Sequence, residues 1–204
     1  MLPANTRIEI MNTSLAKSDT LLQAALTPFD IVRQVGLVIG FSLLTALSAQ
    51  IVIPLGPVPI TGQTFAVLLT GALLGSRLGA MAMIAYLIEG ASGLPFFAGG
   101  AAGLAHLMGQ TGGYLIAFPA AAFITGAFAE QGWDRKYLTA VAAMAAGSVV
   151  IILCGCLWFS FLTRTSPFIA FQFTVLKFIP GDIIKIALAA AVLPTGWKLL
   201  KRKY

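Results

Sequence analysis

The chain has 204 residues, of which 58% are hydrophobic and only 10% are charged. A soluble domain carries roughly 25% charged residues, so this composition excludes a soluble enzyme and a disordered chain. The net charge of +6 does not indicate nucleic-acid binding, because the basic residues are scattered through loops and the C-terminal tail instead of forming one solvated stripe. The composition therefore predicts a small helical protein that crosses a membrane several times.

Residues 1–30 are polar and mixed in charge, unlike the rest of the chain. They lack a basic segment followed by an apolar core and a cleavage site, so we expect no signal peptide here. We predict a cytoplasmic or interfacial extension over residues 1–30 and one six-helix transmembrane, substrate-binding domain over residues 31–204.

The domain prediction rests on six apolar runs, which prolines, glycines and charged residues separate. Six spans of roughly 20 residues would fill most of the chain. We therefore expect an all-α, polytopic membrane protein with six transmembrane helices. The runs cover residues 32–53, 60–75, 78–94, 114–129, 137–162 and 182–197.

The distribution of Lys and Arg predicts the orientation of these spans. If both termini are cytoplasmic, the outer loops contain only Arg164 and Lys177, and Lys185 falls within the sixth span. This asymmetry is what the positive-inside rule requires for an even number of spans. The remaining basic residues would all be cytoplasmic: Arg7, Lys17, Arg33, Arg77, Arg135, Lys136, Lys198, Lys201, Arg202 and Lys203.

Three charged residues lie within the predicted spans: Glu89, Asp182 and Lys185. A charge near the centre of a membrane helix costs about 2.5–3.5 kcal/mol on insertion scales, so such residues are candidates for function. Asp182 and Lys185 are three residues apart and share one helix face. Two interpretations remain open at this point. Asp182 caps the helix while Lys185 extends to the interface, or the two residues form a polar site for a ligand.

Backbone irregularity at membrane depth is tolerated where it is buried in protein or lines a cavity. The prolines before Gln63, the glycines at 99, 100 and 103, and Asp182 all fall on the predicted outer side. We therefore expect a pocket near the outer leaflet that takes a small amphipathic ligand.

Four segments resemble signatures of the BioY family, the biotin-specific S components of energy-coupling factor (ECF) transporters. They occur in the order found in that family and cover almost everything after the first 30 residues. The segments are 57–64 (PVPITGQT), 93–100 (GLPFFAGG), 112–119 (GGYLIAFP) and 178–185 (FIPGDIIK).

The resemblance implies a multi-pass protein of the bacterial inner membrane, in contact with lipid, that captures biotin from outside and is not an enzyme. It implies no cofactor, no metal and no nucleic-acid partner. Uptake would be energised by a transmembrane coupling subunit and two cytoplasmic ATPases, because this chain contains no nucleotide-binding G-x-x-x-x-G-K-[ST] motif. The alternative is a standalone carrier for biotin or another small vitamin. An intramembrane enzyme is disfavoured, because the chain shows no nucleophile motif and has a single His.

The resemblance also implies the ligand contacts. Asp182 and Lys185 are the expected polar contacts, because a carboxylate accepts from the ureido N–H groups of biotin and an ammonium donates to its oxygens. Gln63 offers both a donor and an acceptor to the urea. The other candidates are Tyr86 and Tyr114, which would pack against the ligand, and the loop glycines Gly99 and Gly100.

One departure from the family concerns the loop after Gly100, where many members carry an Arg and this chain has Ala101 and Ala102. His106 is a candidate substitute, with a purely structural role as the alternative. On the first span, Ser42 and Ala46 form a small-xxx-small pair, as do Gly36 and Gly40. We predict Ser42 and Ala46 as the contact with the coupling subunit, and internal packing is the alternative.

Overall fold

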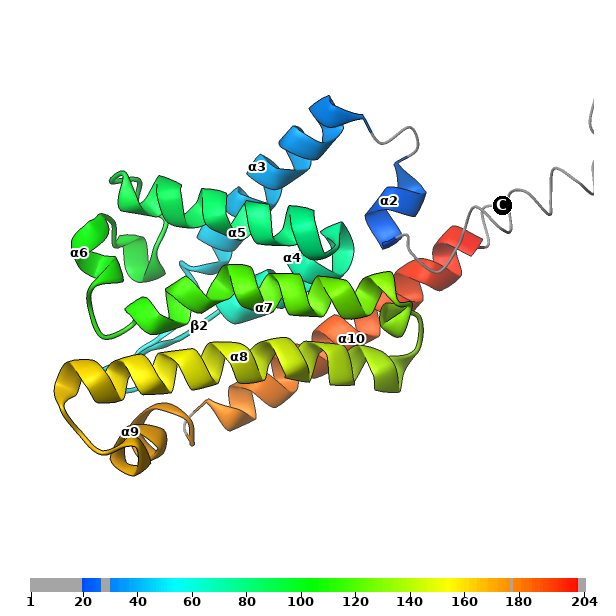
Figure 1. Cartoon of the computed structure of the whole chain (residues 1–204). Helices are drawn as coiled ribbons and strands as arrows, with labels where there is room; N and C mark the ends of the chain where they lie inside the picture. The colour runs from blue at the N-terminus through cyan, green and yellow to red at the C-terminus, as the bar shows by residue number, and fades with distance from the viewer. Residues whose placement is uncertain (1–19, 27–29, 177, 202–204) are drawn as a thin grey trace, which may run out of the picture.

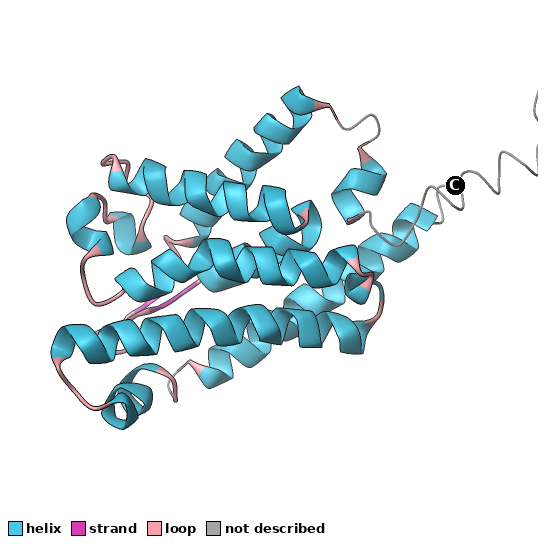
Figure 2. Cartoon of the chain, viewed as in Figure 1, coloured by secondary structure: helices cyan, strands magenta, loops and turns pink. Residues whose placement is uncertain are grey.

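The computed structural model describes residues 20–26, 30–176 and 178–201, and these residues are mostly helical (Figure 2). Most of the predicted N-terminal extension lies outside the described residues. So do Arg7, Lys17, Lys177, Arg202 and Lys203, on which part of the charge asymmetry depended.

The helices alternate with short irregular segments and one two-stranded ribbon. In chain order the elements are α2 (Leu21–Ala25), α3 (Ile31–Ser48), β1 (Val52–Ile53), β2 (Ile60–Thr61), α4 (Gln63–Leu74), α5 (Ser76–Ala91), η1 (Ala98–Gly100), α6 (Leu104–Leu107), α7 (Gly112–Glu130), η2 (Trp133–Arg135), α8 (Tyr137–Thr163), α9 (Pro167–Thr174) and α10 (Ile179–Lys201).

Within the described residues, four helices are long and apolar enough to cross a membrane: α3, α7, α8 and α10. They correspond to the first, fourth, fifth and sixth predicted spans. The second and third predicted spans are shorter, because α4 has 12 residues and α5 has 16. A helix of 12 residues rises roughly 18 Å, whereas the hydrocarbon core of a bilayer is roughly 30 Å thick.

The short helix α4 lies in the centre of the molecule. A Cβ atom added at Gly71 would come within 2.3 Å of the backbone oxygen of Ala122 on α7, so the two backbones are in close contact. α4 ends at Leu74, its C-cap Gly75 has a φ of 89° that favours glycine, and α5 begins at Ser76. Most residues of α4 are buried under the neighbouring helices.

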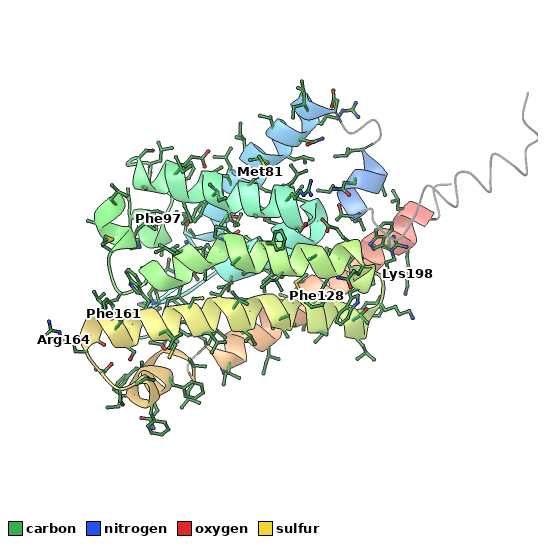
Figure 3. All side chains as sticks on the ribbon, in the orientation of Figure 1. Met81, Phe97, Phe128, Phe161, Arg164 and Lys198 are labelled. Carbon is green, nitrogen blue, oxygen red and sulfur yellow. The ribbon has the colours of Figure 1, made fainter. Side chains whose placement is uncertain are left out.

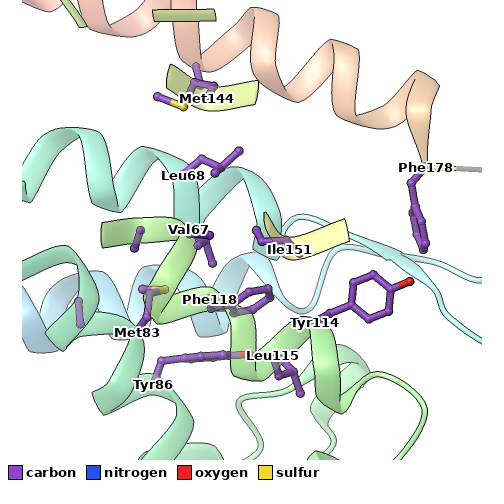
Figure 4. Packing of buried hydrophobic residues seen from close by; sticks show 14 of the residues in the cluster. Val67, Leu68, Met83, Tyr86, Tyr114, Leu115, Phe118, Met144, Ile151 and Phe178 are labelled. Atoms are coloured by element: carbon purple, nitrogen blue, oxygen red, sulfur yellow. The ribbon is translucent and has the colours of Figure 1, made fainter. Parts of the chain in front are cut away.

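The core is built from the facing sides of α4, α7 and α8. Val67 and Leu68 of α4, Phe118 of α7, and Met144 and Ile151 of α8 are all at most 2% exposed. Figure 4 shows their side chains converging between these helices. The core thus fixes the relative positions of the helices that carry the site described below.

The two ends of the helical bundle differ in structure (Figure 1). The β1–β2 ribbon, α6 and α9 lie at one end, which we call the loop end. The helix α2 and the C-terminal part of α10 lie at the other, which we call the terminal end. Figure 3 shows Arg164 at the loop end and Lys198 at the terminal end.

A cluster of polar contacts lies at the terminal end, where η2 meets α10. The indole Nε1 of Trp197 on α10 donates to Oδ2 of Asp134 in η2 at 2.5 Å, and Asp134 is 1% exposed. The guanidinium of Arg135 lies 4.6 Å from the centre of the Trp197 ring. Burial raises the pKa of Asp134 to about 6, although the Trp197 hydrogen bond and the Arg135 charge act in the opposite direction.

Helix α3 is the least covered of the four long apolar helices, because only 17% of its residues are buried. Its inner face packs on α5, where the Ser42 hydroxyl donates to the Glu89 carboxylate. Ser42 is fully buried and Ala46 is 6% exposed. This arrangement favours internal packing for Ser42 and Ala46, the alternative that the sequence left open.

Candidate functional site

A cavity opens at the loop end, between the ribbon, the loop before α6, and the starts of α4, α7 and α10. It encloses about 570 Å³ of space, including its mouth. Segments between residues 58 and 185 meet here, and each of the four signature segments contributes at least one residue to the wall. The lining residues are Val58, Pro59, Thr61, Gln63, Thr64, Ala98, His106, Thr111, Tyr114, Leu115, Phe118, Ile151, Ile152, Phe178, Asp182 and Lys185.

The proline-rich segment forms one wall because the ribbon turns it back over the helices. Ile53 pairs with Ile60, and the amide of Gly62 donates to the carbonyl of Ile51 at 3.0 Å. The intervening turn places Val58 and Pro59 at the cavity. α4 then begins at Gln63, so that Gln63 and Thr64 face the cavity from the first turn of a buried helix.

Asp182 and Lys185 form the charged part of the site. Lys185 Nζ lies 3.6 Å from Asp182 Oδ1, and their side chains are 16% and 13% exposed. Ser148 Oγ on α8 donates to Asp182 Oδ2 at 3.0 Å, and Lys185 Nζ donates to Thr64 Oγ1 at 2.8 Å. Three helices therefore contribute to one polar network at the cavity wall.

The structure bears on the helix-capping interpretation of Asp182, and the role of Asp182 as a ligand contact stays a prediction. α10 begins at Ile179, three residues earlier than the predicted start of the sixth span, and the amide of Asp182 donates to the carbonyl of Phe178 at 2.9 Å. The Asp182 carboxylate accepts from the Ser148 hydroxyl of another helix. Asp182 is therefore a first-turn residue directed into the site and not the N-cap of α10.

Gln63 lines the cavity, and its side-chain amide also makes contacts within the chain. Its Nε2 donates to the hydroxyl of Tyr86 at 2.5 Å, and its Oε1 accepts from Thr61 at 2.9 Å. The Tyr86 hydroxyl in turn donates to the carbonyl of Phe96 at 3.0 Å. Tyr86 is fully buried and does not line the cavity, so the geometry supports a role in fixing the loop around Phe96 and not direct packing on a ligand.

The remaining predicted contacts divide into one that lines the cavity and two that do not. Tyr114 lines it, with its ring 6.0 Å from that of Phe178. Gly99 and Gly100 are exposed and are absent from the wall, which is formed by the adjacent Ala98. Both glycines have positive φ, 66° and 79°, so the turn conformation accounts for them. Their role as ligand contacts stays a prediction.

His106 lies on the cavity wall, and its role as a substitute polar group stays a prediction. Its ring stacks on that of Phe97, with centroids 5.2 Å apart, and its Nε2 lies 3.3 Å from the hydroxyl of Thr111. Partial burial lowers the pKa of His106, which favours a neutral imidazole. A neutral imidazole next to a hydroxyl can donate or accept one hydrogen bond at this part of the wall.

Sequence reasoning missed four polar residues of the site: Thr61, Thr64, Thr111 and Ser148. Thr61 and Thr64 belong to the first signature segment and Thr111 directly precedes the third, so their positions in the sequence were an available signal. Ser148 lies within a uniformly apolar run, and only the packing of α8 on α10 reveals its role.

No group of three His, Cys, Asp or Glu side chains with metal-binding geometry occurs within the part of the chain that the structure describes.

Comparison with known proteins gives a consistent result. The model of the BioY family matches residues 12–202. The chain is 44% identical over 160 residues to "Probable biotin transporter BioY" of Pyrococcus horikoshii, covering 78% of this chain and 93% of that protein. It is 36% identical over 152 residues to "Biotin transporter BioY" of Thermotoga maritima, covering 74% and 88%.

A solved structure is also similar. It is the S component for biotin from an ECF-type ABC transporter, which matches with a TM-score of 0.74 and 27% identity. The match covers 85% of this chain and 95% of the solved one. The overall fold is therefore shared with a protein of that kind.

Proposed function

The chain belongs to the BioY family, and on this premise we propose that it captures biotin for uptake across the membrane as the substrate-binding component of an ECF-type transporter. The family indicated by the four sequence motifs is confirmed. The observation that carries the substrate assignment is the half-buried Asp182–Lys185 pair on the wall of an otherwise largely apolar cavity. The proposal contains no catalytic step and no cofactor.

The chemistry of the wall suits the two halves of biotin. Its ureido ring has two N–H donors and a carbonyl acceptor, and its thioether ring and tail are apolar. Asp182 can accept a charge-assisted hydrogen bond from a ureido N–H, and Lys185 can donate to the ureido oxygen or to the tail carboxylate. Tyr114, Phe118 and Phe178 line the same cavity and offer aromatic surfaces to the rings and tail.

We further propose that the six predicted spans are α3, α4, α5, α7, α8 and α10, with α4 and α5 as the two short ones. In this arrangement the terminal end is cytoplasmic and the loop end faces outward in a bacterial inner membrane. Supporting this orientation, Arg135 and Lys198 belong to η2 and to the C-terminal part of α10, elements joined by the Asp134–Trp197 hydrogen bond.

A partner is required for ATP-driven uptake, and α3 offers the most open surface for a coupling subunit. Ser42 and Ala46, the predicted contacts, face inward. Gly36 and Gly40 form the other small-xxx-small pair, and a Cβ atom added at either would meet nothing within 4 Å. We therefore propose the Gly36–Gly40 face as the contact with a transmembrane helix of the coupling subunit. We infer the two ATPase subunits only from the proposed ECF type of the transporter.

Equilibrium titration of the purified chain in detergent with biotin tests the proposal. We expect tight binding by the wild type and a loss of about tenfold to a hundredfold in Asp182→Asn and in Lys185→Ala, since each removes a hydrogen bond to a charged group. Lys198→Ala is the matched control, because Lys198 lies on the same helix at the terminal end. Absence of binding by a folded wild-type chain would refute the assignment of biotin.

A further inference from the structure

Ser148 donates to a carboxylate on another helix, as Ser42 does to Glu89, and differs in this from several helical threonines. The hydroxyls of Thr45, Thr70, Thr163, Thr174 and Thr195 each donate to the carbonyl four residues earlier in their own helix, at 2.6–2.9 Å. This local bond is the common arrangement for such residues. Ser148 instead donates to the Asp182 carboxylate on another helix.

The packing of α8 fixes the direction of the Ser148 side chain. The preceding residue, Gly147, lies against α7 and α4, where an added Cβ atom would come within 2.2 Å of Thr125 Oγ1 and 2.5 Å of Leu68 Cδ2. Successive residues of a helix are rotated by about 100°, so the close contact at Gly147 turns Ser148 toward α10. Ser148 is 5% exposed and does not line the cavity.

The distances around the charged pair show that its two members are held apart. A direct ammonium–carboxylate hydrogen bond measures roughly 2.7–2.9 Å, whereas Lys185 Nζ and Asp182 Oδ1 are 3.6 Å apart. Each charge has a closer neutral partner, at 3.0 Å for Ser148 with Asp182 and at 2.8 Å for Thr64 with Lys185. These partners lie on α8 and α4, two helices against which α10 packs.

From this geometry we propose that Ser148 is a positioning residue for ligand binding: its hydroxyl holds the Asp182 carboxylate away from Lys185, which leaves both charges able to meet a ligand. The inference rests on the proposed function. Without the hydroxyl, the carboxylate rotates toward Lys185 and the two close into a direct ion pair. A ligand then has to break that pair before it can bind, and its affinity falls.

Three variants of the full chain in detergent test this role: Ser148→Ala, Ser148→Thr and Ser160→Ala. Ser160 is the matched control, because it lies on the same helix, is 7% exposed and donates to the carbonyl of Thr165 away from the cavity. We expect Ser148→Ala to bind biotin about tenfold more weakly than the wild type. Ser148→Thr, which keeps the hydroxyl, and Ser160→Ala should remain within about threefold of the wild type.

The unfolding temperature without ligand separates positioning from stability. We expect Ser148→Ala to stay within about 4 °C of the wild type, because the fold does not depend on this hydroxyl. Wild-type affinity in Ser148→Ala, equal losses in the Ala and Thr variants, or weaker binding that comes with a larger fall in unfolding temperature would each overturn the inference. Failure of the folded wild type to bind biotin would instead count against the proposed function.

Discussion

Asp134 and Asp182 are carboxylates with different burial and different partners: Asp134 is 1% exposed, whereas the side chain of Asp182 is 13% exposed. Asp182 has a hydroxyl and an ammonium close to its two oxygens. Asp134 has one oxygen hydrogen-bonded to Trp197, and its other oxygen has no hydrogen-bond partner among the described residues. Burial with incomplete compensation disfavours the charged form, which explains the pKa of about 6 for Asp134.

The raised pKa of Asp134 predicts that this residue makes the stability of the chain depend on pH. The folded chain holds the Asp134 proton more tightly than the unfolded chain, where the ordinary pKa is 3.8. The free energy of unfolding should therefore fall as pH rises from about 4 to about 6, by roughly 3 kcal/mol. Asp134→Asn keeps an acceptor for Trp197 and should remove this dependence.

Unfolding temperatures in detergent at several pH values between 4 and 7.5 provide the measurement. The exposed carboxylate Asp30, which lies outside this cluster, serves as the control, and Asp30→Asn should keep the wild-type pH dependence. Identical pH profiles for the wild type and Asp134→Asn would show that Asp134 does not titrate in this way.

At the level of single elements, α3 presents two small-residue faces with opposite environments. Ala46 is 6% exposed and faces the interior, whereas Gly40 has open space around it. We predict that Ala46→Trp destabilises the chain and weakens biotin binding, because the indole has no room. Gly40→Trp should keep biotin binding and abolish uptake, because the indole blocks the proposed contact with the coupling subunit.

Biotin binding in detergent and biotin uptake by cells that contain the coupling module, measured for both variants, distinguish the two faces. Gly40→Ala is the control, since it adds a single methyl group to the same open face. Normal uptake by Gly40→Trp would contradict the proposed face, and unchanged binding by Ala46→Trp would contradict the internal role of Ala46.

The sequence predicted the long helices well because each is a continuous apolar run bounded by charges, prolines or glycines. It extended the first span to residue 53, but α3 ends at Ser48 and residues 52–53 form β1, since the ribbon pairs them with residues 60–61. It did not predict α9, because Pro167–Thr174 lies in a stretch with no clear period. The hydropathy of a segment indicates how long an apolar run is, but it does not show that residues 52–53 pair with residues 60–61 in a ribbon.

The candidate site was predictable where charge within an apolar run was itself the anomaly, as for Asp182 and Lys185. Tyr86 could not be placed from sequence, because an aromatic residue in a span looks the same whether it faces a cavity or the core. Ser148 could not be found either, since its significance depends on which face of α8 meets α10. Contacts between helices far apart in sequence set these positions.

For the molecule as a whole, the open question is whether this chain acts with partners or alone. We predict that expression of the chain by itself in a biotin-uptake mutant without any coupling module gives no accumulation, and that adding the module restores it. The reason is that the chain contains no nucleotide-binding motif. Accumulation by the chain alone, measured with labelled biotin and abolished by Asp182→Asn, would favour the standalone carrier.

The shortness of α5 has a consequence for the lipid around the protein. Between Arg77 and Glu89 its outward surface includes Met81, Ile84 and Ile88, an apolar band much shorter than the thickness of a membrane. In the proposed six-span arrangement, lipid tails beside this helix would compress or tilt to match it, at a fraction of a kcal/mol for each Å of mismatch. The bilayer would then be thinner on this flank of the protein, and the acyl-chain length of the surrounding lipid would set the size of the mismatch.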